Sequence, residues 1–193
     1  MRSHKLSCLM AQAGIALLAM LLLPACSVKV DKDGSGEEKK VDIKTFAGGI
    51  HVSQDANPSE TGLPVYPGAH LKADDSSDDK GANVNISGFG YGVKVVALDY
   101  QSDDAPSKIL AFYKDQLKKY GNVLECHTSK GDWNINMGHK DSNELTCQGS
   151  GGVDTELKAG KQDNQHIVAV RPEGTGSKFT LVYVRTHGKD TDI

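Results

Sequence analysis

Apolar and polar residues alternate over several short segments of the chain, as in strands that bury one face of a sheet. The segments 84–87 and 93–100 flank a glycine cluster at 88–92, and the second is apolar at both odd and even positions. A strand that is apolar on both sides belongs in the middle of a sheet. The same pattern predicts further strands at 123–128, 145–148, 155–158, 166–171 and 179–186.

One segment has the three- and four-residue spacing of an amphipathic helix, from Ala105 to Tyr120. Asp103 or Asp104 is expected to cap its N-terminus, and Gly121 stands where a helix ends. The apolar stripe is expected to lie on the core, and it consists of Ile109, Phe112, Tyr113, Leu117 and Tyr120.

The order of these elements predicts an α+β fold, with a mainly antiparallel, twisted sheet and one amphipathic helix packed on a face. The glycine cluster leads into a strand instead of a helix, so we expect a hairpin turn there and not a phosphate-binding loop. Residues 63–193 are predicted to form a single domain, preceded by a weakly structured lead-in at 41–62 and a polar, flexible tether at 26–40.

The chain begins with two basic residues, Arg2 and Lys5, followed by a mostly apolar run from Cys8 to Leu23. This run is shorter than the roughly 20 residues that a membrane-spanning helix needs, which indicates an export signal. The run ends in Leu23-Pro24-Ala25-Cys26, which resembles the lipobox of bacterial lipoproteins, although Pro24 stands where a small or aliphatic residue is usual.

The resemblance to bacterial lipoproteins implies that residues 1–25 are cleaved as a signal peptide and that Cys26 becomes the acylated first residue. Cleavage by a general signal peptidase, which would leave Cys26 as a free thiol, is the alternative. Ser27 follows the cysteine in place of Asp, and in the family this implies the outer membrane, with the protein facing the periplasm. Two or three acyl chains would hold the protein firmly on a membrane.

A second resemblance covers residues 63–125. The entry segment Val65-Tyr66-Pro67-Gly68-Ala69, together with the Phe112-Tyr113 helix that ends at Gly121, is similar to a recurrent module of uncharacterised bacterial envelope lipoproteins. The similarity implies a small α+β domain outside the cytoplasm. It implies no substrate, because the matching positions are apolar and turn residues.

The net charge argues against one class of partner, nucleic acids. The formal net charge is −3, and it becomes −5 once Arg2 and Lys5 leave with the signal peptide. A nucleic-acid partner is therefore not expected, and the acyl group on Cys26 must supply the attachment to the membrane. The remaining partner classes are an envelope protein and a polysaccharide.

The mature chain keeps two cysteines besides Cys26, namely Cys126 and Cys147. In an oxidising compartment they are expected to form a disulfide. A zinc site made with His127 and His139 is the alternative, but the spacing lacks the compact Cys and His pairs of such sites. No cofactor is expected.

The loop 129–143 carries Trp133, the only tryptophan of the chain. An exposed Trp on a disulfide-closed loop is a candidate contact for a partner, and the alternative is a side chain that folds back over the core. No serine-hydrolase elbow or nucleotide loop is present. We therefore expect a lipid-anchored envelope protein that binds or supports other components and is not an enzyme; a periplasmic hydrolase or metal-dependent enzyme is the alternative.

Overall fold

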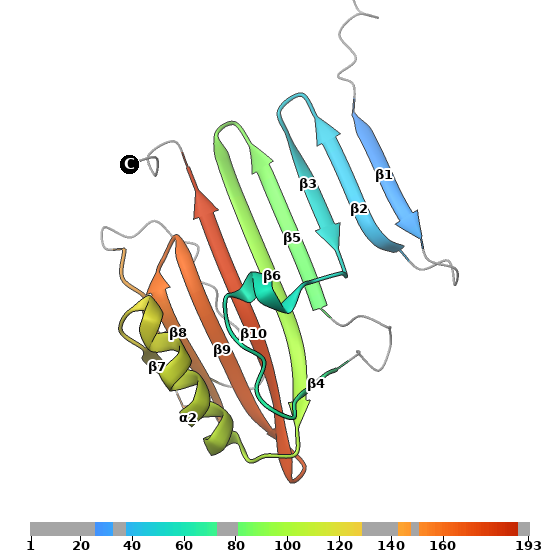
Figure 1. Cartoon of the computed structure of the whole chain (residues 1–193). Coiled ribbons are helices and arrows are strands. Elements are labelled where there is room, and N and C mark those ends of the chain that lie inside the picture. Colours follow the sequence, from blue (N-terminus) through green and yellow to red (C-terminus); the bar gives the residue numbers. More distant parts are fainter. Residues whose placement is uncertain (1–25, 33–37, 73–80, 129–142, 148–150, 189–193) are drawn as a thin grey trace, which may run out of the picture.

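A computed structural model describes residues 26–32, 38–72, 81–128, 143–147 and 151–188. These residues form one ten-stranded antiparallel sheet with one α-helix and two short 3₁₀ helices (Figure 1). The strands are β1 (Ser27–Lys32), β2 (Glu38–Thr45), β3 (Gly48–Ser53), β4 (His70–Leu71), β5 (Gly81–Gly88), β6 (Tyr91–Ser102), β7 (Leu124–Thr128), β8 (Asp154–Lys161), β9 (Asn164–Glu173) and β10 (Gly176–His187). The helices are η1 (Pro58–Thr61), α2 (Pro106–Leu117) and η2 (Lys118–Tyr120).

The sheet consists of two meanders that share a central seam. Its strand order is β1-β2-β3-β5-β6-β10-β9-β8-β7, and the short β4 pairs with the far end of β6. The seam is the pairing of β6 with β10, which runs from Gly92 opposite His187 to Ser102 opposite Ser177. The predictions of a mainly antiparallel, twisted sheet and of a central strand at 93–100 are thus confirmed.

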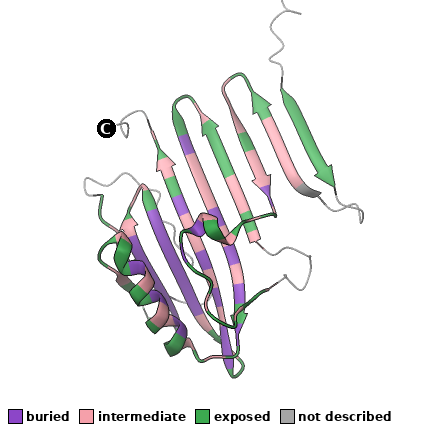
Figure 2. Ribbon diagram, viewed as in Figure 1, coloured by how far each residue is buried: buried purple, intermediate pink, exposed green. Residues whose placement is uncertain are grey.

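The apolar core lies over the half of the sheet formed by β6 and β8 to β10. Helix α2 contributes Ile109, Tyr113 and Leu117 to this core. These three residues belong to the predicted apolar stripe and are fully buried. Figure 2 shows the buried residues concentrated in this half of the sheet and on one side of the helix. The strand residues of the core are Val96, Leu98, Tyr100, Leu157, Ala159, Val168, Val170, Phe179 and Leu181.

Tyr113 connects α2 to the segment that enters the core before β4. Its hydroxyl donates a hydrogen bond to the Pro64 carbonyl oxygen at 3.1 Å and accepts one from the Tyr66 amide at 3.1 Å. Burial raises the pKa of Tyr113 well above its ordinary value, so the hydroxyl keeps its proton at every physiological pH. The extended path around Pro64 is therefore fixed by a helix residue that lies far away in sequence.

The N-terminal predictions were wrong in the described residues. Residues 27–32 and 38–45, expected as tether and lead-in, form β1 and β2, which pair with each other. The alternation of Val28 and Val30 with Lys29 and Asp31 outweighs the polar composition, because these valines face apolar residues of β2 across the ladder. Among the described residues the sheet therefore begins at Ser27, and the pairing of β3 with β5 continues it across residue 63.

Two smaller predictions also need correction. The N-cap of α2 is Ala105, without a side-chain cap, because Asp104 instead accepts hydrogen bonds from Lys108 and Tyr66. Residues 143–147 include the start of the expected strand 145–148 but form no strand. Gln162 holds this segment: its backbone N–H donates to the Asn143 side-chain oxygen at 3.0 Å, and its side-chain amide donates to the Glu144 carbonyl oxygen at 2.9 Å.

His166 lies in a closely packed cluster between β9 and the end of η1. Its ring stacks on Tyr120 with centroids 3.5 Å apart, and its Nδ1 lies 2.9 Å from the Thr61 carbonyl oxygen, to which it donates as a neutral imidazole. Gly62, in a left-handed conformation with φ 70°, leaves room that a side chain would take from Tyr120 and His166. Burial is the main cause that lowers the pKa of His166, and the nearby Lys119 adds to it.

We predict that this cluster makes folding stability depend on pH. A histidine whose folded-state pKa is lowered binds fewer protons when folded than when unfolded, so stability falls as pH drops below its ordinary pKa of 6.5. Urea unfolding should show that the free energy of unfolding falls between about pH 7.5 and about pH 5, and that it falls less in His166→Gln than in the parent protein. An equal loss in both proteins would show that His166 is not its source.

Candidate binding surface

The side of the sheet that carries apolar residues is not the same in its N-terminal and C-terminal halves. On one face, two rows across β1, β2, β3, β5 and β6 contain only valine and isoleucine. The first row is Val28, Ile43, Ile50, Ile86 and Val93, and the second is Val30, Val41, Val52, Val84 and Val95. We call these ten positions the aliphatic face.

The opposite side of the same strands is polar. Its neighbouring row contains Lys29, Asp42, His51, Asn85 and Lys94. The Asp42 carboxylate lies 2.7 Å from His51 Nδ1, and this hydrogen bond is the main cause that lowers the pKa of Asp42. Since side chains alternate along a strand, this half of the sheet turns its apolar side away from the side on which Val96 and Leu98 of β6 enter the core.

The aliphatic face is open to solvent on β1, β3 and β5. Val28 is 58% exposed, Ile86 44%, and both Ile50 and Val30 39%. Soluble monomers rarely expose apolar patches larger than a few hundred Å², and larger ones mark contacts with a protein or a membrane. No residue of the described chain covers these four side chains fully.

Toward the C-terminal half, the same side of the sheet forms a hollow of about 290 Å³. Half of the residues that line it are aliphatic, and Asp99 and Arg171 are among the polar ones. Asp99 accepts a hydrogen bond from Thr180 and pairs with Lys178 at 3.2 Å, so its charge is balanced. The full lining is Val95, Ala97, Asp99, Glu156, Ile167, Arg171, Thr180 and Val182.

One wall of the hollow contains a buried ion pair. Glu156 and Lys158 lie two residues apart on β8, with Oε2 and Nζ 3.2 Å apart, and their side chains are 4% and 0% exposed. Burial raises the pKa of Glu156, and the attraction of Lys158 opposes that shift. A carboxylate held in this way can meet a ligand as a hydrogen-bond acceptor without adding much free charge.

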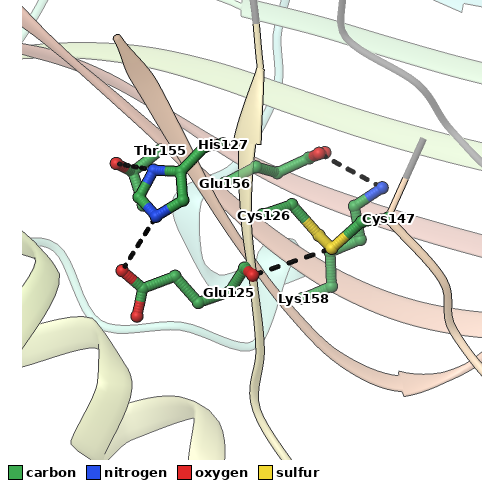
Figure 3. The surroundings of a disulfide bond; sticks show 7 residues. All are labelled: Glu125, Cys126, His127, Cys147, Thr155, Glu156 and Lys158. Carbon is green, nitrogen blue, oxygen red and sulfur yellow. Dashed lines mark hydrogen bonds and ion pairs between the residues drawn. A yellow bond between two sulfur atoms is a disulfide. The ribbon is translucent and has the colours of Figure 1, made fainter. Parts of the chain in front are cut away.

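The predicted disulfide is present beside this pair. Cys126 of β7 is bonded to Cys147, and it lies opposite Glu156 in the ladder, so the bridge shares a face with the hollow (Figure 3). Its neighbours on β7 point to the other side, where Glu125 lies 3.8 Å from His127 and 2.6 Å from Lys114. Because both sulfurs are in the bridge, they are not available as thiolate ligands for the alternative zinc site.

The other predicted site residues are distributed as follows. Cys26 is exposed and directly precedes β1. Trp133 and His139 lie outside the described residues, so the contact proposed for Trp133 stays a prediction. Within the described ranges, no three His, Cys, Asp or Glu side chains are close enough to hold a metal ion. Sequence reasoning missed the aliphatic face, although the alternation of Val28, Val30, Val41 and Ile43 indicates strands with one apolar side.

Comparisons with protein-family models, curated proteins and solved structures found no match. Among the helices of the described chain, none combines the length and the apolar character needed to cross a bilayer. The function must therefore be inferred from the residues and their geometry.

We predict that the disulfide contributes about 3 kcal/mol to stability, because it closes a loop between residues 21 apart in sequence. Cys126→Ser should lower the melting temperature by about 6–12 °C and make the thiol of Cys147 reactive toward a maleimide. The unreduced parent protein is the control. A maleimide adduct on Cys126 and Cys147 in the folded, unreduced parent would contradict the bridge.

Proposed function

We propose that this protein is a lipid-anchored component of the bacterial cell envelope, held by acyl chains on Cys26, with its α+β domain facing the periplasm from the outer membrane. Helix α2 packs on one face of its sheet, and the domain acts as a binding or structural module without catalysis of its own. The leader that ends in Leu23-Pro24-Ala25-Cys26 supports the anchor. The exposure of Cys26 in front of β1 also supports it.

The observation that carries the binding role is the aliphatic hollow on the side of the sheet opposite α2. A concave apolar site with a few polar groups at its margin is the usual form of a binding site. Its walls, Val95, Ala97, Ile167 and Val182, favour an apolar side chain of an envelope protein over a polysaccharide, which needs polar and aromatic contacts. We therefore propose that the partner is a protein.

The anchor is tested by Cys26→Ser. Loss of the thiol should abolish acylation, and the protein should leave the membrane fraction or accumulate as the uncleaved precursor. Fractionation with mass spectrometry of the N-terminus measures both effects. A parent protein with an unmodified N-terminus at another residue would refute the anchor.

The binding role is tested by filling the hollow. A photoreactive residue in place of Arg171 crosslinks an envelope protein that occupies the hollow. Ala97→Phe should lower the yield of this crosslink about tenfold, equivalent to about 1.4 kcal/mol of binding free energy. Leu71→Phe on the other face, where Leu71 is 39% exposed, is the matched control and should leave capture unchanged. Equal capture by both variants, at unchanged melting temperatures, would remove the hollow as the site.

A further inference from the structure

One end of the sheet brings together Cys26 and the tips of two hairpins. Ser27 pairs with Lys44 next to the β2–β3 turn, and Gly48 of that turn pairs with Gly88 at the β5–β6 turn. The Phe89 amide donates to the Ala47 carbonyl oxygen at 3.2 Å, so the two tips are in contact. In Figure 1 these turns and the start of β1 lie at the upper end of the sheet.

Each tip presents a large side chain to solvent. Phe46 is 83% exposed at the first tip, and Phe89 and Tyr91 are 75% and 59% exposed at the second. Val28, the first residue of the aliphatic face, is 58% exposed at the same end. Exposure of two phenylalanines at turns has no packing reason within the described chain, and it marks a contact surface. We call these four residues the aromatic end.

The backbone of the second tip supports a functional reason for Phe89. The turn between β5 and β6 contains two residues, Phe89 and Gly90, with φ 51° and 85°. Such turns favour asparagine and glycine, because a side chain at positive φ is crowded by its own backbone. A phenylalanine that is strained and exposed serves neither the turn nor the core, and strain of this kind is typical of functional sites.

We propose that the aromatic end contacts the phospholipid bilayer in which the acyl chains of Cys26 are inserted. This inference rests on the proposed lipid anchor. Aromatic rings are favoured at the level of the lipid headgroups, where their apolar bodies leave water. β1 begins at Ser27, directly after Cys26, so no spacer separates this end of the sheet from the anchor.

The geometry gives the domain a defined orientation on the membrane. Two hairpin tips and the acylated residue contact the membrane at separate points on one end of the sheet. These contacts restrain rotation of the domain relative to the membrane, whereas a single flexible tether would leave it free to rotate. The β9–β10 turn at Gly174, the other end of the long central strands, then points away from the bilayer. The hollow is carried on strands that rise from the membrane and stays open to a periplasmic partner.

Depth measurement on the acylated full-length protein tests the proposal. Ser87→Cys, next to the second tip, and Thr175→Cys, in the β9–β10 turn, each receive an environment-sensitive fluorophore; both positions are exposed. In vesicles of phosphatidylethanolamine and phosphatidylglycerol that carry a lipid-borne quencher, we expect at least about threefold stronger quenching at position 87. Equal quenching at both positions would overturn the proposal.

A second measurement separates this inference from the anchor. Protein with Cys26→Ser, which lacks acyl chains, should bind the same vesicles weakly, and Phe46→Ser with Phe89→Asn should lower that binding about tenfold. Phe89→Asn creates the favoured Asn-Gly turn, so the melting temperature should not fall. Val153→Ser, which removes a valine that is 76% exposed elsewhere, is the control.

The possible results discriminate between the two proposals. An unacylated Cys26 in cells refutes the anchor, while vesicle binding that depends on Phe46 and Phe89 still supports the aromatic end. An acylated Cys26, with vesicle binding unaffected by the two phenylalanines, overturns the aromatic end and leaves the anchor. In a third case, the fluorophore at position 87 is quenched by a quencher attached to a second copy of the protein but not by the lipid-borne quencher. This result would assign the surface to self-association and would also overturn the proposal.

Discussion

Strand register is the constraint on which the rest of this structure depends. Since neighbouring residues point to opposite faces, a slip of one residue would exchange the faces of a whole strand. The pairing of Val28 with Ile43 and of Val84 with Val95 aligns the aliphatic face over five strands. The same register places Leu98 beside Leu181 in the core. One set of backbone hydrogen bonds therefore determines both the core and the surface.

The sheet uses this alternation to divide its tasks between two halves. In the C-terminal half, the side chains beneath α2 are apolar and give the domain its stability. In the N-terminal half, the corresponding side holds Asp42, His51 and Lys94, and the apolar residues face the other way. β6 belongs to both halves, with Val96 in the core and Val95 on the aliphatic face. This explains why it is apolar on both sides.

Sequence reasoning succeeded where local pattern and local chemistry agree. The helix from Pro106 and the central strand follow from the periodicity of apolar residues, and the Cys126–Cys147 bridge follows from the two cysteines left besides Cys26 in a mature chain. It failed for β1 and β2, because their polar composition was given more weight than their alternation. The hollow and the aromatic end lay beyond its reach, since each is assembled from residues on strands that meet only through long-range pairing.

Cys26, the hollow and the buried pair of Glu156 and Lys158 therefore differ in whether local sequence alone can predict them. The local motif Leu23-Pro24-Ala25-Cys26 alone predicts a role for the first. The other two depend on the β6–β10–β9–β8 order of the sheet, which brings Ala97 and Glu156 to the lining of one hollow although many residues separate them in sequence. Alternation within each strand gives the face of a residue, but only the strand order gives its neighbours.

The seam between β6 and β10 also has a consequence for the order of folding. Every other long strand pair joins consecutive or nearly consecutive strands, whereas α2, β7, β8 and β9 all intervene between β6 and β10 in sequence. Closing so long a loop costs entropy before any contact forms, so the two meanders should form first and the seam last. Until then each half carries an unpaired edge, and a newly synthesised chain passes through an interval in which it is open to aggregation.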